Sequence, residues 1–278
     1  MARERITLKS NSDILLMREA GLITSAALKA VKEAIVPGVS TLELDAIAEA
    51  TIISMGAKSN FKLVAGYKHT ICSSINDEVV HGIPSQDRIL EAGDIISIDC
   101  GAITPSGWNG DAAFTKVVGG GDPEIMAQRQ QISDACEASL WAGIAAFAGA
   151  KRLNEVGRAV EKSIKAAGRY GILQDYIGHG VGRSMHEDPA VFNYQTRDLG
   201  PVVEPGLVIA IEPMITSGGQ AVKILTDEWT VSSKDGSDSS HWEHTVARHS
   251  GGIWVLTAED GGVAGLARYG ITPVPLES

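Results

Sequence analysis

Two segments of this chain resemble each other at a separation of 113 residues, and this repeat constrains the fold more than any other feature. Residues 91–99 read EAGDIISID and residues 204–212 read EPGLVIAIE, so each is a turn and an apolar strand that ends on a carboxylate. Upstream, each copy carries an apolar face with helical spacing, again 113 residues apart. These faces are Ile23, Ala27, Val31 and Ala34 in the first copy and Cys136, Leu140, Ile144 and Phe147 in the second.

Capping signals indicate where the helices begin. Ser40 and Glu43 form a capping box for the second helix of the first copy, and Asp122-Pro123 suits the start of the long helix of the second copy. Each copy therefore predicts two helices followed by antiparallel strands. We expect an α+β fold in which residues 1–278 form one domain of two pseudo-symmetric halves, with the repeat at about 14–104 and 127–217.

The composition predicts a globular protein that works in the cytoplasm. Its 24 Lys and Arg against 34 Asp and Glu give a net charge of −10, which argues against nucleic acid or an anionic membrane as the main partner. No stretch approaches the roughly 18 apolar residues of a membrane span, and the N-terminal residues contain no apolar run typical of a signal peptide. Three cysteines without CxxC spacing indicate a reducing compartment.

Carboxylates interrupt strands that are otherwise apolar. Residues 95–103 and 108–117 predict a hairpin around a turn at 104–107, and Asp99 and Asp111 are equally distant from its centre at residue 105. We therefore expect these two aspartates to face each other, with Cβ atoms about 4.5–5.5 Å apart. Two like charges so close in a partly buried sheet require either a proton or a cation between them.

The second half supplies two more acids: Glu212 by the repeat, and Glu243 in a strand predicted over 240–247. Any one of these acids could be an exposed strand residue, but the hairpin and the repeat bring four of them together. Two divalent cations would balance four negative charges. Oxygen ligands, with or without one imidazole, suit Mn²⁺, Fe²⁺, Co²⁺ or Zn²⁺.

Three of the seven histidines lie in contexts that suit a site. His81 stands at a strand end before a turn, His179 in a glycine-rich bend, and His186 before Glu187-Asp-Pro. The glycines around His179 do not begin a helix, and neither a Walker A nor a GxGxxG motif occurs, which disfavours nucleotide binding. We expect His241 and His244 to be neighbours of the site rather than ligands, and His69 and His249 to be surface or core residues.

Taken together, these stretches resemble the type I methionine aminopeptidases, metallopeptidases of the pita-bread (creatinase/aminopeptidase) fold in their short bacterial form. The resemblance spans most of the chain in order. The matching stretches are SINDEVVHGIP from residue 74, GDIISID from 93, GWNGD from 107, GHGVGRSMHEDP from 178, IEPM from 211 and WEHT from 242.

The resemblance implies a dinuclear metal site and an assignment of roles. Two divalent ions (Co, Mn, Fe or Zn) would activate a water that hydrolyses the peptide bond, Asp111 and Glu243 would bridge them, and Glu212 would also carry the proton to the leaving amine. His81 and His186 would be catalytic without binding metal. The implied ligands are Asp99, Asp111, His179, Glu212 and Glu243, and the implied methionine pocket is Phe61, Tyr67, Cys72, Met185 and Trp229, with Met185 where phenylalanine is usual.

The family removes the initiator methionine from new polypeptides whose second residue is small. The resemblance therefore implies nascent chains as substrate, the ribosome as a candidate partner, and a monomer. Two other readings stay open. One is a pita-bread peptidase that cuts X-Pro bonds, although the first helix, expected near residue 13, leaves no room for the N-terminal domain typical of those enzymes. The other is a non-catalytic binding protein, although such proteins lose ligands that are all present here.

Overall fold

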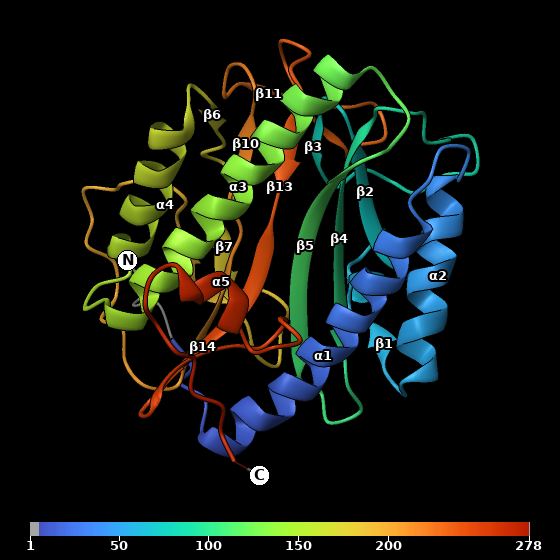
Figure 1. Cartoon of the computed structure of the whole chain (residues 1–278). Helices are drawn as coiled ribbons and strands as arrows, with labels where there is room; N and C mark the ends of the chain where they lie inside the picture. The colour runs from blue at the N-terminus through green and yellow to red at the C-terminus, as the bar shows by residue number, and fades with distance from the viewer. Residues whose placement is uncertain (1–5, 278) are drawn as a thin grey trace.

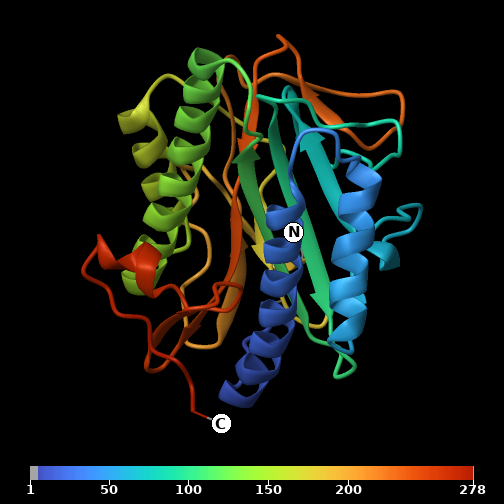
Figure 2. The ribbon, with the colours of Figure 1, turned by 45° about the vertical axis from the view of Figure 1, so that its right-hand side comes forward.

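The computed structural model describes residues 6–277, in which helices pack on one side of a long, curved antiparallel sheet (Figure 1). Helices α1 and α2 cover one half of this sheet, while α3 and α4 cover the other half, as the rotated view also shows (Figure 2). Residues 1–5, part of the segment in which the sequence predicts no signal peptide, lie outside the described residues. Within residues 6–277, no helix has both the length and the hydropathy to cross a membrane.

Helices α2 and α3 begin where the capping signals predict, and α1, expected near residue 13, begins at Asn11. Ser10 caps α1 and Ser40 caps α2, each in a capping box with the acid three residues later, and Asp122 caps α3 with Pro123 in its first turn. The helices are α1 (Asn11–Ala34), α2 (Thr41–Ser54), α3 (Pro123–Gly149), α4 (Asn154–Ala167) and α5 (Val263–Ala267), with a short 3-10 helix η1 (Phe61–Leu63).

Over the described residues the main sheet has nine strands, all paired antiparallel, in the order β1-β4-β5-β14-β9-β7-β8, with β2 also paired to β4 and β15 to β14. Its strands are β1 (Lys58–Ser59), β2 (Ile71–Ile75), β4 (Ile95–Ile103), β5 (Asn109–Val117), β7 (Gly178–Gly180), β8 (Glu187–Val191), β9 (Leu207–Ile211), β14 (Glu243–His249) and β15 (Gly252–Val255). Two three-stranded sheets flank it, made of β3 (Glu78–Val80), β11 (Val222–Ile224) and β12 (Val231–Ser233), and of β6 (Gly171–Ile172), β10 (Met214–Thr216) and β13 (Ser239–His241).

The two halves have matching element positions. Helices α2 and α4 each have 14 residues and begin 113 residues apart, at 41 and 154. In the sheet, β14 lies beside β9 as β5 lies beside β4, and β5 pairs with β14 where the halves meet. This arrangement supports the interpretation of the chain as two related halves with a pseudo-two-fold axis between β5 and β14.

Two large apolar cores lie between the helices and the sheet, one in each half, and a further cluster lies against the start of α1. Val31 of α1 and Ile98 of β4 belong to the first core, while Leu140 of α3 and Ile209 of β9 belong to the second. The partly buried side chain of Trp242 packs against both cores. The apolar faces predicted by the repeat thus point inward, and Ala34 alone among their members is only partly buried.

The predicted register of the β4–β5 hairpin was wrong by two residues. Asp99 pairs with Ala113 and Asp111 pairs with Gly101, because the hairpin is centred on residue 106 rather than 105. The reason is a three-residue turn: the Gly107 N–H donates to Thr104 O (2.8 Å), the Thr104 N–H donates to Trp108 O (3.1 Å), and Gly107 has φ +80°. A shift of two residues keeps both aspartates on one face, as diagonal rather than direct neighbours.

A second correction concerns the strand predicted over 240–247. It is interrupted at Trp242, so that His241 ends β13 and Glu243 begins β14. The strand predicted to begin at Trp108 begins one residue later, at Asn109, because the Trp108 carbonyl closes the turn.

Candidate metal centre

Five neighbouring strands of the main sheet each bring one polar side chain to a common site. In sheet order, β4 carries Asp99, β5 carries Asp111, β14 begins with Glu243, β9 is followed directly by Glu212, and β7 carries His179. The site therefore lies across the junction of the two halves, with two acids from each half.

The distances between these side chains are short enough for them to bind the same metal ion. The Nε2 atom of His179 lies 3.4 Å from Glu212 Oε1 and 4.0 Å from Asp111 Oδ2. Asp111, His179 and Glu243 are buried, and each offers a ligand atom within 4.8 Å of those of the other two. Nitrogen and carboxylate oxygens at such separations could all reach a cation placed among them.

Burial among like charges makes these carboxylates poor acids. Burial raises the pKa of Asp99 to about 7, where nearby Glu212 also raises it and His241 opposes the shift, and burial raises the pKa of Glu212 to about 8. The pKa values of Asp111 and Glu243 rise well above their usual range through burial and then through the neighbouring carboxylates. Protons or cations must therefore neutralise the cluster.

Unpartnered oxygens favour cations over protons as the groups that complete the site. Among the residues that the structure describes, Asp99 Oδ1, Asp111 Oδ1 and Glu243 Oε1 are buried and have no hydrogen-bond partner. A buried carboxylate oxygen without a partner is costly, whereas a divalent cation would satisfy several at once. The donor set, four carboxylates and one imidazole, thus fits hard or borderline divalent metal ions.

His179 is oriented as a metal ligand would be. Its Nδ1–H donates to the carbonyl of Gly180 at 3.0 Å, which leaves the Nε2 lone pair directed toward the acids. Burial, and then the neighbouring His186, lowers the pKa of His179 to about 3, so the ring is neutral and able to bind a cation.

The other two predicted histidines lie beside this cluster. The ring of His186 meets that of His179 edge-on, with ring centres 4.1 Å apart. His81 follows β3 with a positive φ of 60°, and its ring meets that of Tyr176 at 5.8 Å. Burial lowers the pKa of His81 to about 4, and His241 and His186 add to the shift. Both imidazoles line the cavities at the site, where a neutral ring can donate or accept one hydrogen bond.

An apolar cavity of about 160 Å³ opens beside the acids. Tyr67 and Trp229 form one wall with ring centres 5.1 Å apart, and the Tyr67 hydroxyl is held by the carbonyl of Ile71 at 2.6 Å. Aromatic, thiol and thioether groups together suit a flexible apolar side chain. All five residues expected to form a methionine pocket line this cavity, namely Phe61, Tyr67, Cys72, Met185 and Trp229, and Val64 joins them.

A second cavity of about 190 Å³ meets the acids from another side. His81, His186 and Glu212 line both cavities, so the two meet at the acid cluster. Sequence reasoning missed Tyr176 and Met214 in the second cavity, because a tyrosine and a methionine in apolar surroundings carry no signal that separates them from core residues.

Three of the four remaining histidines lie as expected, whereas the prediction that His244 is a neighbour of the site was wrong. His241 is a neighbour of the cluster, with Nε2 3.6 Å from Glu212 Oε2, whereas His244 turns away to bond Thr257 Oγ1 at 2.8 Å. His69 lies near Asp45, 3.5 Å away, and His249 is a buried residue bonded to the carbonyl of Val274.

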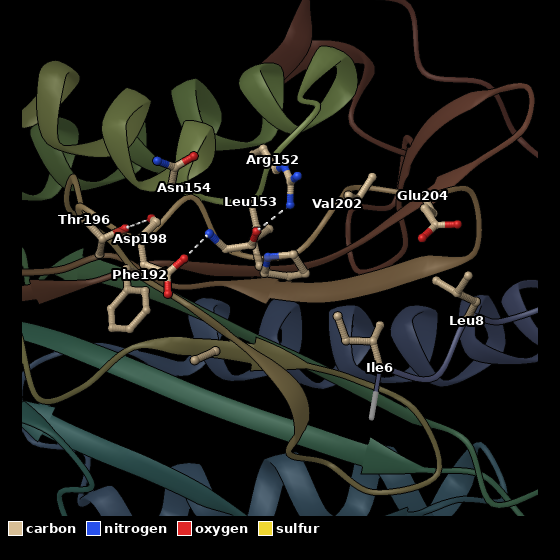
Figure 3. A pocket seen from close by; sticks show the side chains of 13 residues that line it. Ile6, Leu8, Arg152, Leu153, Asn154, Phe192, Thr196, Asp198, Val202 and Glu204 are labelled. Carbon is tan, nitrogen blue, oxygen red and sulfur yellow. Dashed lines mark hydrogen bonds between the residues drawn. The ribbon is translucent and has the colours of Figure 1, made fainter. Parts of the chain in front are cut away.

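A larger cavity of about 870 Å³ lies elsewhere, between the segment at Ile6 and the loop that ends at Glu204 (Figure 3). None of the candidate site residues lines it. Its polar side chains form hydrogen bonds with the backbone of the loop: Asp198 accepts from the Gly200 N–H at 2.9 Å, and Arg152 donates to the Gly200 carbonyl at 3.3 Å. This cavity lacks the convergent titratable groups that the acid cluster has.

Known proteins resemble this chain over nearly its whole length. Residues 15–249 match the metallopeptidase family M24. "Methionine aminopeptidase 1" of Mycobacterium tuberculosis is 45% identical over 260 residues, 92% of this chain and 96% of that protein. The "Methionine aminopeptidase" of Escherichia coli K12 is 36% identical over 91% of this chain and 94% of that protein.

Solved structures also resemble the fold of this chain. The methionine aminopeptidase of Thermotoga maritima superimposes with a TM-score of 0.86 at 35% identity and covers 92% of this chain and 100% of its own. The prolidase of Pyrococcus furiosus superimposes with a TM-score of 0.69 at 25% identity, over 90% of this chain but only 65% of its own.

Proposed function

This chain belongs to the metallopeptidase family M24, and from that premise we propose that it removes the N-terminal methionine of new polypeptides whose second residue is small. The pita-bread fold and the metallo-aminopeptidase activity follow from the family. The observation that carries the proposal is the meeting of four acids and one imidazole from adjacent strands with an apolar cavity lined by Tyr67, Cys72 and Trp229.

We propose that the centre holds two divalent cations, Co, Mn, Fe or Zn. Asp111 and Glu243, the acids of the two central strands β5 and β14, would bridge them. His179 and Glu212, 3.4 Å apart, would complete one site, and Asp99 on the far strand β4 would complete the other. When bound, such a pair supplies Lewis acidity that polarises a carbonyl and makes water nucleophilic at neutral pH.

The chain's own residues would direct the reaction. The apolar cavity would take the methionine side chain and so place the scissile carbonyl beside the acids. Glu212, as a carboxylate beside the bound cations, would accept a proton from water and deliver it to the leaving amine. His186 would donate a hydrogen bond to the developing oxyanion, and His81 would contact the amide nitrogen.

We further propose that residues 1–278 act as one catalytic domain, as a monomer in the cytoplasm. Its substrate would be the methionine end of a nascent chain, and the ribosome is a candidate partner. The single catalytic domain is supported by the continuous sheet across both halves and by the match of 92% of the chain to the Mycobacterium tuberculosis relative.

A panel of short peptides tests the activity. We expect purified protein with added Mn²⁺ to release methionine from Met-Ala-Ser but to leave Ala-Pro-Ala intact, and to lose activity after EDTA dialysis until Mn²⁺, Co²⁺ or Fe²⁺ is restored. Release of alanine from Ala-Pro-Ala with no cleavage of Met-Ala-Ser would favour an X-Pro peptidase. Metal binding without hydrolysis of either peptide would favour a non-catalytic protein.

A further inference from the structure

We propose that His241 is a positioning residue that holds the carboxylate of Glu212 from the side opposite His179. This inference rests on the proposed role of Glu212 as both ligand and proton carrier. It assigns to His241 neither a metal bond nor a contact with substrate.

The two oxygens of Glu212 face two different imidazoles. Oε1 lies 3.4 Å from Nε2 of His179, and Oε2 lies 3.6 Å from Nε2 of His241. His179 already donates its Nδ1–H to a carbonyl, so its Nε2 cannot donate to Oε1 while the ring is neutral, and a cation would join the two. On the other side, an Nε2–H of His241 would join the second pair directly.

Within residues 6–277, the Nε2 atom of His241 has no hydrogen-bond partner. The residue is only 2% exposed. The 3.6 Å distance to Oε2 is longer than a hydrogen bond, and the two atoms would have to approach by about 0.4 Å or more to form one. A buried N–H without an acceptor costs free energy. Among the described residues, Glu212 is the only carboxylate within ion-pair distance of this N–H, so we take Glu212 as its acceptor.

The backbone of His241 is held in place by hydroxyl groups from two strands of the main sheet. Its N–H donates to Thr115 Oγ1 at 3.0 Å and to Ser97 Oγ at 3.2 Å, and its carbonyl accepts from Thr115 Oγ1 at 2.8 Å. Ser97 and Thr115 also bond each other at 2.9 Å. These bonds fix the Cα position, and the imidazole is therefore presented to Glu212 from a rigid base.

The consequence is a division of labour between the two oxygens. With Oε2 held by His241, Oε1 stays directed toward His179, where a cation would bind. Groups that orient metal ligands in this way are typically worth about 10–100-fold in metal affinity or activity.

Two amide substitutions test the proposal. In His241→Gln the side-chain amide can still reach Oε2 with an N–H, whereas in His241→Asn it is too short to do so. The matched control is His249→Asn, because His249 is equally buried, 2% exposed, and bonds a backbone carbonyl away from the site. For each variant, isothermal titration of the metal-free protein with Mn²⁺ gives the Kd, hydrolysis of Met-Ala-Ser gives kcat and KM, and thermal unfolding gives Tm.

We expect His241→Asn to weaken Mn²⁺ binding and to lower kcat by about 10–100-fold each, with KM within about twofold. His241→Gln should recover both to within about threefold, and His249→Asn should lower Tm without changing Kd or kcat. The proposal is overturned if His241→Asn matches the wild type in Kd and kcat, or if His241→Gln is impaired as much as His241→Asn. Failure of the wild type to cleave Met-Ala-Ser would refute the proposed function, while the Mn²⁺ titrations would still decide the role of His241.

Discussion

Each acid of the centre would by itself destabilise the fold, because a carboxylate in a buried strand loses its hydration. The sequence revealed this for Asp99 and Glu212, which stand at equivalent places in the repeat, and the structure brings them to one site with Asp111 and Glu243. It did not reveal Tyr176 or Met214, because an aromatic or thioether side chain is as common in a core as in a cavity. The roles of the site residues stay predictions.

At this scale, Glu212→Gln separates proton transfer from shape. The amide keeps the size and one ligand oxygen but cannot carry a proton, so we expect kcat for Met-Ala-Ser to fall by about 10²–10⁴-fold. Methionine release measured by chromatography checks this. The control is Glu204→Gln, an exposed acid in the turn before the same strand, which should change nothing. Turnover near the wild-type rate in Glu212→Gln would refute the assignment.

At the scale of elements, the starts of helices were predicted from the sequence more accurately than the pairing of strands. Each of α1, α2 and α3 is capped by a side-chain hydrogen bond within a stretch of four residues. The caps of α2 and α3 were predicted directly from the sequence. The β4–β5 register depends instead on which turn the segment 104–107 adopts, and a symmetric turn and a three-residue turn fit the same letters. Gly107 adopts a left-handed conformation, and this conformation produces the three-residue turn. The residue types alone do not determine which of the two turns forms.

Gly107→Ala tests that turn. At φ +80° a Cβ costs about 1–2 kcal/mol, so we expect the free energy of unfolding in urea to fall by roughly that amount. Mn²⁺ affinity should fall as well, because the turn sets the diagonal placement of Asp99 and Asp111. Gly119→Ala is the matched control: its φ is not left-handed and a Cβ there meets nothing within 4 Å. Equal effects of the two substitutions would contradict the argument.

At the scale of the whole molecule, the chain joins two cores across one sheet, and its N-terminal segment is fastened to the second half. The Lys9 N–H donates to the carbonyl of Gly206 at 2.7 Å, and Lys9 Nζ pairs with Glu187 Oε2 at 2.8 Å. The Lys9 side chain is 1% exposed, and Glu187 directly follows His186. This ion pair therefore ties the start of the fold to the segment that carries a candidate catalytic histidine.

Lys9→Met should cost more stability than the same change on the surface. Removing Lys9 leaves the carboxylate of Glu187, whose side chain is 17% exposed, without its cation, and this should cost about 1–3 kcal/mol. Lys29→Met removes an exposed pair with Glu259 and should cost about 0–1 kcal/mol. Urea unfolding of both variants gives the comparison, and losses of similar size would show that the Lys9 pair does not anchor the segment.

The stability of the metal-free protein should fall as pH rises from about 6.5 to 8. In this range Asp99 and Glu212, with pKa values of about 7 and 8, lose protons in the folded state, whereas in the unfolded chain they are already ionised. The site histidines, with lowered pKa values, are neutral when folded and deprotonate in the unfolded chain near about 6.5, at the lower edge of the range. The folded state thus holds more protons, and stability declines with pH.

Thermal unfolding at several pH values after removal of metal measures this slope. Saturating Mn²⁺ should flatten it, because cations then replace the protons that neutralise the acids. A Tm of the metal-free protein that stays level or rises between pH 6.5 and 8 would contradict the clustering of ionisable acids in this site.

The most direct test is anomalous diffraction from crystals of the full chain grown with Mn²⁺. Two peaks about 3.5–4 Å apart, both within bonding distance of the side chains of Asp111 and Glu243, are the predicted result. Absence of anomalous density among the five proposed ligands, or manganese bound only elsewhere on the molecule, would contradict the proposal that a pair of cations holds the acids of the two halves together.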